Sequence, residues 1–174
     1  MRRLLLLRHS KTERPEAGER DRDRKLMARG RADAAVIGAY MARHRLIPDL
    51  VLVSPAQRAV ETWALVGAAF SKAPRMMKED RIYNASPEAL ADLIRETDDA
   101  TALLLVGHNP GLHDLATELI GSGNIEARES LNEKLPTSGL VVIDFAFDDW
   151  SKLHDCAGRL DRFVTPHSIG AASD

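Results

Sequence analysis

The sequence has a single cysteine, no long apolar run and no excess of charge of one sign. Cys156 cannot form a disulfide within the chain, which is typical of a reducing compartment. No stretch approaches the roughly 18 consecutive apolar residues of a transmembrane helix. The formal net charge is -2, so no overall basic field attracts nucleic acid. We therefore expect a cytoplasmic protein without a nucleic-acid or membrane partner.

The segment MRRLLLLRHS resembles a targeting signal only in part, because two arginines precede four leucines. A secretory signal requires about 7–15 apolar residues and a cleavage site of small residues. Here the apolar run ends at Arg8. Residues 4–7 instead predict a short strand that is buried on both faces of a sheet.

Strand and helix patterns alternate along the rest of the chain. Strands are predicted over residues 50–53, 101–106, 140–145 and 150–157, with one more within residues 75–83. Helices are predicted over residues 26–45, 55–70, 87–95 and 112–120. Such alternation predicts a three-layer α/β fold, in which a mostly parallel sheet is flanked by helices on both faces. We expect one domain over residues 1–174, with a loose tail after about residue 165.

Two helices are expected to begin at a Ser-Pro pair. Ser54 and Ser86 are suitable N-caps, and a proline at the first helical position has the backbone angle that a helix needs. The first of these helices carries Arg58 in its first turn. Residues 11–25, which follow the first strand, are polar and contain the charge run ERDRDRK. We expect them to form a solvated loop beside the mouth of the pocket.

Positive or ionisable side chains follow three of the predicted strands. Arg8 and His9 end the first strand, Arg58 follows the second, and His108 follows the third. Because ligands of open α/β sheets bind beyond the carboxyl ends of the strands, we expect these four side chains to converge. A guanidinium group can bind two phosphate oxygens at once, in a bidentate contact, and a neutral imidazole can attack phosphorus. The pattern therefore predicts a phosphate pocket with His9 as the nucleophile, helped by His108.

Four segments, in order, resemble the histidine phosphatase superfamily. LLLLRHSKTE is similar to its RHG-type signature, with Ser10 where glycine is commoner. LMARG, PDLVLVSPAQRAVET and LLLVGHNPGL follow, and LPTSGLVVIDF is most similar to the SixA-type phosphohistidine phosphatases. The resemblance covers roughly residues 3–160. It implies a phosphoglycerate mutase-like fold and a phosphatase that needs no metal or organic cofactor.

The resemblance also implies residue roles. His9 would accept the phosphoryl group, Arg8 and Arg58 would bind its oxygens, and His108 would complete the pocket. We also expect Ser10, beside the nucleophile, to contact the substrate. Larger members protonate the leaving group with a carboxyl group, and the only candidates in the corresponding region are Glu79 and Asp80. Neither falls on a recognisable motif, which favours an activated substrate such as phosphohistidine.

The remaining polar and aromatic residues are expected to be structural. Four histidines lack metal-ligand spacing and are expected at the surface or in structural contacts; they are His44, His113, His154 and His167. Trp63 and Trp150 are expected to pack in the core. Thr137 and Ser138 fit either the pocket rim or a turn before a strand.

Three functions remain open at this level. The first is a phosphatase that acts on phosphohistidine in proteins or on another small phosphorylated substrate. The second is a phosphotransferase like phosphoglycerate mutase, although the chain lacks the longer insertion that this activity usually needs. The third is a non-catalytic module that binds phosphate or phosphoproteins, which the serine at position 10 and the missing acid keep open. The sequence predicts no oligomeric state.

Overall fold

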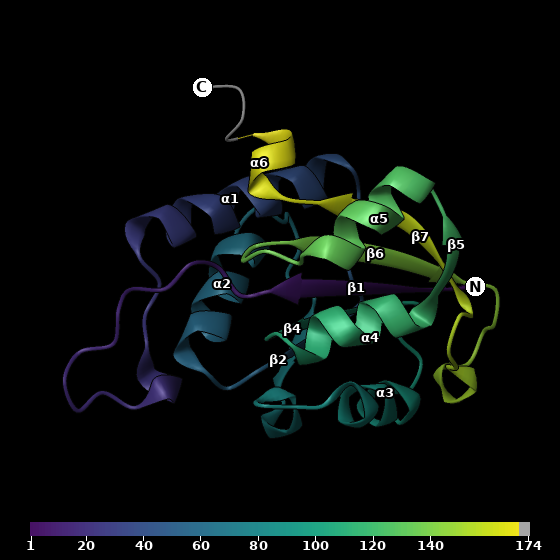
Figure 1. The fold of residues 1–174 in the computed structure, drawn as a ribbon, viewed down its shortest axis with the longest axis horizontal. Helices are drawn as coiled ribbons and strands as arrows, with labels where there is room; N and C mark the ends of the chain where they lie inside the picture. Colours follow the sequence, from purple (N-terminus) through teal and green to yellow (C-terminus); the bar gives the residue numbers. More distant parts are fainter. Residues whose placement is uncertain (171–174) are drawn as a thin grey trace.

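The computed structural model describes residues 1–170 and shows a seven-stranded sheet between two layers of helices (Figure 1). The strands are β1 (Arg2–Arg8), β2 (Leu50–Val53), β3 (Arg75–Lys78), β4 (Ala102–Gly107), β5 (Ile120–Gly123), β6 (Leu140–Phe145) and β7 (Gly158–Val164). The helices are α1 (Ala28–Arg43), α2 (Gln57–Gly67), α3 (Pro87–Arg95), α4 (Gly111–Leu119), α5 (Ile125–Glu133) and α6 (Pro166–Ile169). Three 3-10 turns, η1 (Asp21–Asp23), η2 (Asp80–Ile82) and η3 (Trp150–Lys152), complete the described elements.

The sheet has the strand order β3-β2-β4-β1-β6-β7-β5. β6 is antiparallel to both β1 and β7, and the other neighbours are parallel. The predicted mostly parallel α/β sheet is therefore confirmed.

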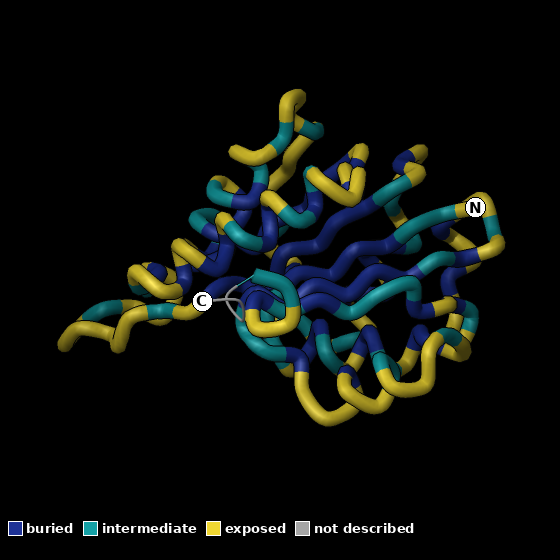
Figure 2. The backbone as a smooth tube through the Cα atoms, turned by 90° about the horizontal axis from the view of Figure 1, so that it is seen from above, coloured by how far each residue is buried: buried dark blue, intermediate teal, exposed yellow. Residues whose placement is uncertain are grey.

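The predicted first strand lies at the centre of the sheet with both faces covered. Leu4 and Leu6 pack into one core cluster, together with side chains of α3 and α4. Leu5 and Leu7 pack into the other, together with side chains of α1 and α2. Successive side chains of a strand point to opposite faces, so four consecutive leucines serve both layers. Figure 2 shows the buried sheet at the centre and exposed backbone on the outer helices.

The helix starts agree with the sequence in one case and differ in the other. Ser86 caps α3 through a bond from the Ala89 amide, with Pro87 in the first turn, as predicted. The prediction that Ser54 caps the next helix is wrong, because α2 begins at Gln57 and its N-cap is Ala56. The Ser54 hydroxyl is instead bonded to His108.

The second half of the sheet differs more from the sequence prediction. The strand predicted over residues 150–157 is wrong, since Trp150 begins η3 and the last strand is β7. Trp150 is buried against Phe145 and donates its indole N–H to the Ala100 carbonyl over 2.7 Å. The tryptophan at the start of this segment therefore indicates core packing and not a strand. β5 and α5 were not predicted, because β5 is IGSG and α5 has one buried residue.

Part of the predicted tail is a short helix that packs on the domain. The first residues of the predicted tail form α6, whose Ile169 packs against the cluster beneath α1 and α2. Residues 171–174 of that tail lie outside the described part.

Within residues 1–170, no helix has the length and apolar character needed to cross a membrane.

A loop that we call the arm, residues 12–26, follows the carboxyl end of β1. It is closed at its base by a bridge between Thr12 and Leu26 and extends beyond the body of the domain (Figures 1 and 2). Helix α1 crosses this base at Gly30, where an added Cβ would lie 2.1 Å from the carbonyl oxygen of Lys11. Only glycine allows this approach, so the LMARG motif anchors the arm.

We predict that Gly30→Ala destabilises the protein by about 1–3 kcal/mol, because the clash is with backbone and no side chain can move to relieve it. Urea unfolding measures the change. Gly67→Ala is the control, since the nearest atom to its Cβ would belong to the Trp63 side chain, at 3.1 Å. It should have a smaller effect, because a side chain can shift slightly and alanine favours helix. Equal effects of the two substitutions would contradict the proposed anchor.

Candidate active site

His9 is fixed at the carboxyl end of β1 by its backbone and its ring. Its amide donates to the Gly107 carbonyl over 3.0 Å, and its carbonyl accepts from the Ser138 amide at 3.2 Å. The ring atom Nδ1 lies 2.8 Å from the Ser10 carbonyl oxygen. A carbonyl only accepts, so Nδ1 carries the proton and Nε2 carries the lone pair. Nε2 makes no hydrogen bond within the described residues, so its lone pair is free.

His108 lies beside His9 because β1 and β4 are neighbours in the sheet. The centroids of the two rings are 5.3 Å apart, and the ring planes are inclined by 51°. Nε2 of His108 is 2.7 Å from the Ser54 hydroxyl oxygen, which also accepts from the Ala56 amide. Ser54 therefore orients this second imidazole, a role that the sequence did not reveal.

Arg58 enters the site from the first turn of α2, as predicted. Only 8% of its side chain is exposed. Its guanidinium donates from Nη1 to the Asp21 carbonyl, over 2.7 Å, and from Nη2 to the Asp21 carboxylate, over 3.0 Å. The site thus includes a carboxylate from the arm, which supports the expected position of residues 11–25 beside the pocket.

Arg8 completes the cationic side of the site from the last residue of β1. Its Nη1 donates to the Leu135 carbonyl over 3.1 Å, and the same carbonyl accepts from Asn109 Nδ2 at 2.9 Å. This shared acceptor joins the loop before β6 to the ends of β1 and β4. Burial lowers the pKa of Arg8, but an arginine side chain remains charged in proteins.

Burial and the nearby cations keep both site histidines neutral. Burial, with smaller contributions from His108, Arg58 and Arg8, lowers the pKa of His9 to about 3, against the bond to the Ser10 carbonyl. Burial and Arg58 lower the pKa of His108 to about 4. At neutral pH His9 therefore has the unprotonated nitrogen that attack on phosphorus requires.

Ser10 does not lie where we predicted a substrate contact. Its side chain has no exposed area, and its hydroxyl is bonded to the hydroxyl of Ser138. Its amide donates to Thr62 Oγ1 over 2.9 Å, and Thr62 in turn donates to the Arg58 carbonyl. The placement argues against a substrate contact through the Ser10 hydroxyl and gives Ser10 a positioning role. Of the two rim candidates, Ser138 is fully buried and Thr137 is half-buried.

The carboxyl groups considered as acids are engaged elsewhere. Glu79 caps η2 and pairs with Arg81, which lowers the pKa of Glu79. Asp80 is 90% exposed and has Arg22 as its ion-pair partner. The carboxylate nearest the site chemistry is Asp21, and Tyr83 and Arg58 lower its pKa to about 2. Asp21 was missed because the charge run around it reads as solvated surface.

The other histidines have structural or surface positions, as the sequence indicated. His113 bonds to the Leu131 carbonyl, His44 stacks against Tyr40, and His154 and His167 are exposed. Over residues 1–170, no three His, Cys, Asp or Glu side chains are grouped in a way that could hold a metal ion.

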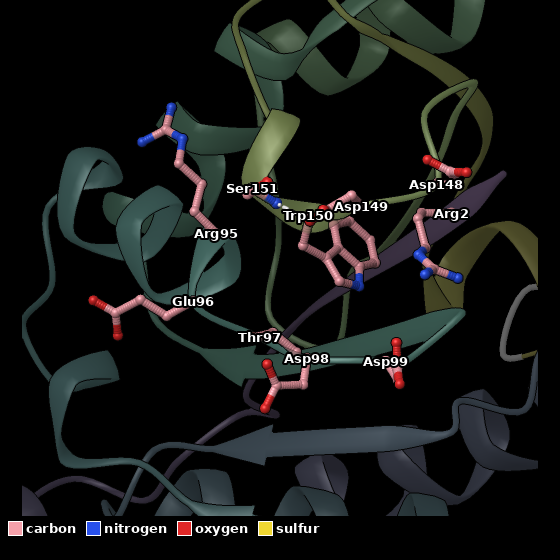
Figure 3. Close-up of a pocket in the computed structure, with 10 residues that line it drawn as sticks. All are labelled: Arg2, Arg95, Glu96, Thr97, Asp98, Asp99, Asp148, Asp149, Trp150 and Ser151. Atoms are coloured by element: carbon pink, nitrogen blue, oxygen red, sulfur yellow. Dashed lines mark hydrogen bonds between the residues drawn. The ribbon is translucent and has the colours of Figure 1, made fainter.

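A cavity of about 330 Å³ lies at the opposite edge of the sheet from His9. Figure 3 shows that residues 95–99 and 148–151 line it together with Arg2, the first residue of β1. Its lining contains no histidine and mixes acidic side chains with two arginines. The two site histidines therefore lie at the carboxyl ends of the strands and not in this cavity.

We predict that acid destabilises the fold through the buried histidines. The unfolded chain binds protons at its usual histidine pKa of 6.5, whereas folded His9 binds them only near pH 3, so stability is lost as pH falls between these values. From about pH 7 to about pH 5, His9 accounts for up to about 2 kcal/mol of this loss. Urea unfolding of His9→Asn should show a smaller decrease than the wild type. His154→Asn, at an exposed site, is the control; an unchanged decrease in His9→Asn would contradict the assignment.

Comparison with known proteins agrees with this geometry. Residues 4–83 match the model of the histidine phosphatase superfamily, branch 1. A crystal structure from Agrobacterium tumefaciens, provisionally named the phosphohistidine phosphatase SixA, is 34% identical, with a TM-score of 0.82 over 95% of this chain and 98% of that one.

Two further comparisons extend the likeness. An uncharacterized protein of Mycobacterium tuberculosis is 35% identical over 92% of this chain and 99% of that protein. A protein histidine phosphatase SixA complexed with tungstate has the same fold, with 19% identity and a TM-score of 0.72 over 96% of this chain and 99% of that one. Full-length similarity, the shared fold and the paired site histidines lead to one conclusion: the chain belongs to the histidine phosphatase superfamily, in its SixA-like branch.

Proposed function

We propose that this phosphatase acts without a metal ion through a phosphohistidine intermediate on His9. One observation carries the proposal: the Ser10 carbonyl fixes the His9 proton on Nδ1 and leaves Nε2 unprotonated beside His108 and two arginines. A nucleophile of this kind needs no base to activate it. Arg8 and Arg58 supply the donors and positive charge that the phosphoryl oxygens require, and the neutral His108 ring completes the site beside them.

The reaction takes place in two displacements. In the first, Nε2 of His9 forms a bond to phosphorus, and the bond from phosphorus to the leaving group breaks with its electron pair. In the second, a water oxygen forms a bond to phosphorus and loses a proton, which replaces the one that the leaving group takes from solvent; the Nε2–phosphorus bond breaks, and inorganic phosphate is released. His9 regains its lone pair, so no oxidant or reductant is consumed.

The substrate that we propose is phosphohistidine carried by a protein. An alkoxide leaving group must receive a proton from an acid. Among the described carboxyl groups considered for this role, Asp21 is ionised and tied to Arg58, and Glu79 and Asp80 pair with other arginines. An imidazole leaves more readily than an alkoxide and needs less help. The name of the Agrobacterium tumefaciens relative supports the same substrate class.

We predict that the protein dephosphorylates a phosphohistidine-bearing protein in excess EDTA and turns over an aryl phosphate more slowly. His9→Ala should lower both rates by at least about 1,000-fold, since it removes the atom that bonds to phosphorus. Radiolabelled phosphate release measures the first rate and absorbance the second. His154→Ala, at an exposed site, is the matched control and should retain full activity.

Other outcomes separate the competing functions. Activity that survives in His9→Ala would contradict the proposed nucleophile. Transfer of labelled phosphate from a bisphosphorylated primer to a monophosphoglycerate would favour the mutase-like function. Tight binding of a phosphoprotein without release of phosphate would favour a non-catalytic binding module.

A further inference from the structure

The arm places its own anion on the arginine that the proposed mechanism assigns to the phosphoryl group. Asp21 accepts from Nη1 of Arg58 with its carbonyl and from Nη2 with its carboxylate, at 2.7 Å and 3.0 Å. A carboxylate uses the same guanidinium donors as a phosphate oxygen. We infer that the Asp21 carboxylate competes with phosphoryl groups for Arg58 and so weakens their binding. The inference rests on the proposed function of Arg58.

The burial of the two partners shows which one must move. The side chain of Arg58 is 8% exposed, and that of Asp21 is 50% exposed. Arg58 belongs to helix α2, whereas Asp21 belongs to η1, a short turn within the exposed arm. Arg58 is therefore the fixed member of the pair. A phosphoryl group that takes both Arg58 donors must displace Asp21 toward solvent.

The neighbours of Asp21 make its carboxylate an effective competitor. The Tyr83 hydroxyl donates to Oδ2 over 2.5 Å, and Arg24 donates to Oδ1 over 3.3 Å. These contacts and Arg58 hold the pKa of Asp21 near 2, so it remains an anion at any pH of interest. Tyr83 in turn lies edge-on to His108, with ring centroids 5.6 Å apart. Asp21 is thus held, through Tyr83, next to one of the two site histidines.

Competition of this kind weakens every ligand that needs Arg58. The apparent affinity for a phosphoryl group equals the intrinsic affinity multiplied by the fraction of protein in which Arg58 is released from Asp21. A ligand that binds only through its phosphoryl group, such as the product phosphate, is then held weakly. A phosphoprotein gains additional contacts outside the pocket and stays bound. Asp21 would therefore speed the release of the product phosphate.

A positioning role for Asp21 would give the opposite result in a binding measurement. If Asp21 served mainly to orient Arg58, removing its charge would leave the guanidinium misplaced and weaken anion binding. If Asp21 competes, removing its charge strengthens anion binding. Isothermal titration of the full chain with inorganic phosphate, in excess EDTA, distinguishes the two roles and does not require catalysis.

We predict that Asp21→Asn binds inorganic phosphate about 3–10-fold more tightly than the wild type, because one charge-assisted bond to Arg58 no longer has to be broken. Asp23→Asn is the matched control. It removes the same charge from the same turn, its side chain is 51% exposed, and its partner is Arg20. Phosphate affinity in this control should remain unchanged. Tyr83→Phe keeps the charge but removes a bond that holds Asp21, and should strengthen binding to a smaller extent.

The outcomes separate this inference from the proposed function. Unchanged or weaker phosphate binding in Asp21→Asn would overturn the competition, and so would an equal gain in Asp23→Asn. If Asp21→Asn does not fold, an unchanged affinity in Tyr83→Phe overturns it instead. Arg58→Ala tests the pocket itself: phosphate binding that survives this change would show that the proposed phosphate site is wrong.

Discussion

The register between β1 and β4 is the constraint on which the site depends. Arg8 is paired with Gly107 across these strands, so the next residues, His9 and His108, emerge side by side. The four leucines do not fix this register by themselves, since both faces of β1 are apolar. Specific bonds at the two ends of β1 add to them: Arg3 lies opposite Asp144 of β6 and donates to its carboxylate over 2.7 Å, and beyond Arg8 the His9 amide donates to the Gly107 carbonyl of β4.

The same convergence makes the site costly for the fold. Two arginines and two imidazoles lie together, and burial disfavours every charge among them. The histidines avoid this cost by remaining neutral. The arginines cannot lose their charge, so each needs an acceptor: Arg8 has the Leu135 carbonyl, and Arg58 has Asp21. The same two arginines and two histidines therefore affect both the chemistry of the site and the stability of the unliganded chain.

The sequence was informative where one local pattern decided the structure. Buried apolar runs predicted β1, β2, β4 and β6, and the residues after three of them predicted the site. It failed where distant partners decided the outcome. Ser54 reads as a helix cap because only the fold brings His108 to its hydroxyl. Asp21 reads as solvated because its partners, Arg58 and Tyr83, are far away in sequence. β7 was missed because RLDRF carries three charged residues, two of which form ion pairs at the sheet surface.

Ser10 shows how a departure from the family signature is accommodated. A glycine there would need no partner, but a fully buried hydroxyl must have one. Ser138 supplies it from a backbone with a φ of 62°, a conformation that a non-glycine residue adopts at some cost. The amide of Ser138 also donates to the carbonyls of Arg8 and His9. The strained turn therefore holds His9 in place and also satisfies the added hydroxyl, so residues 10 and 138 constrain each other although they are distant in sequence.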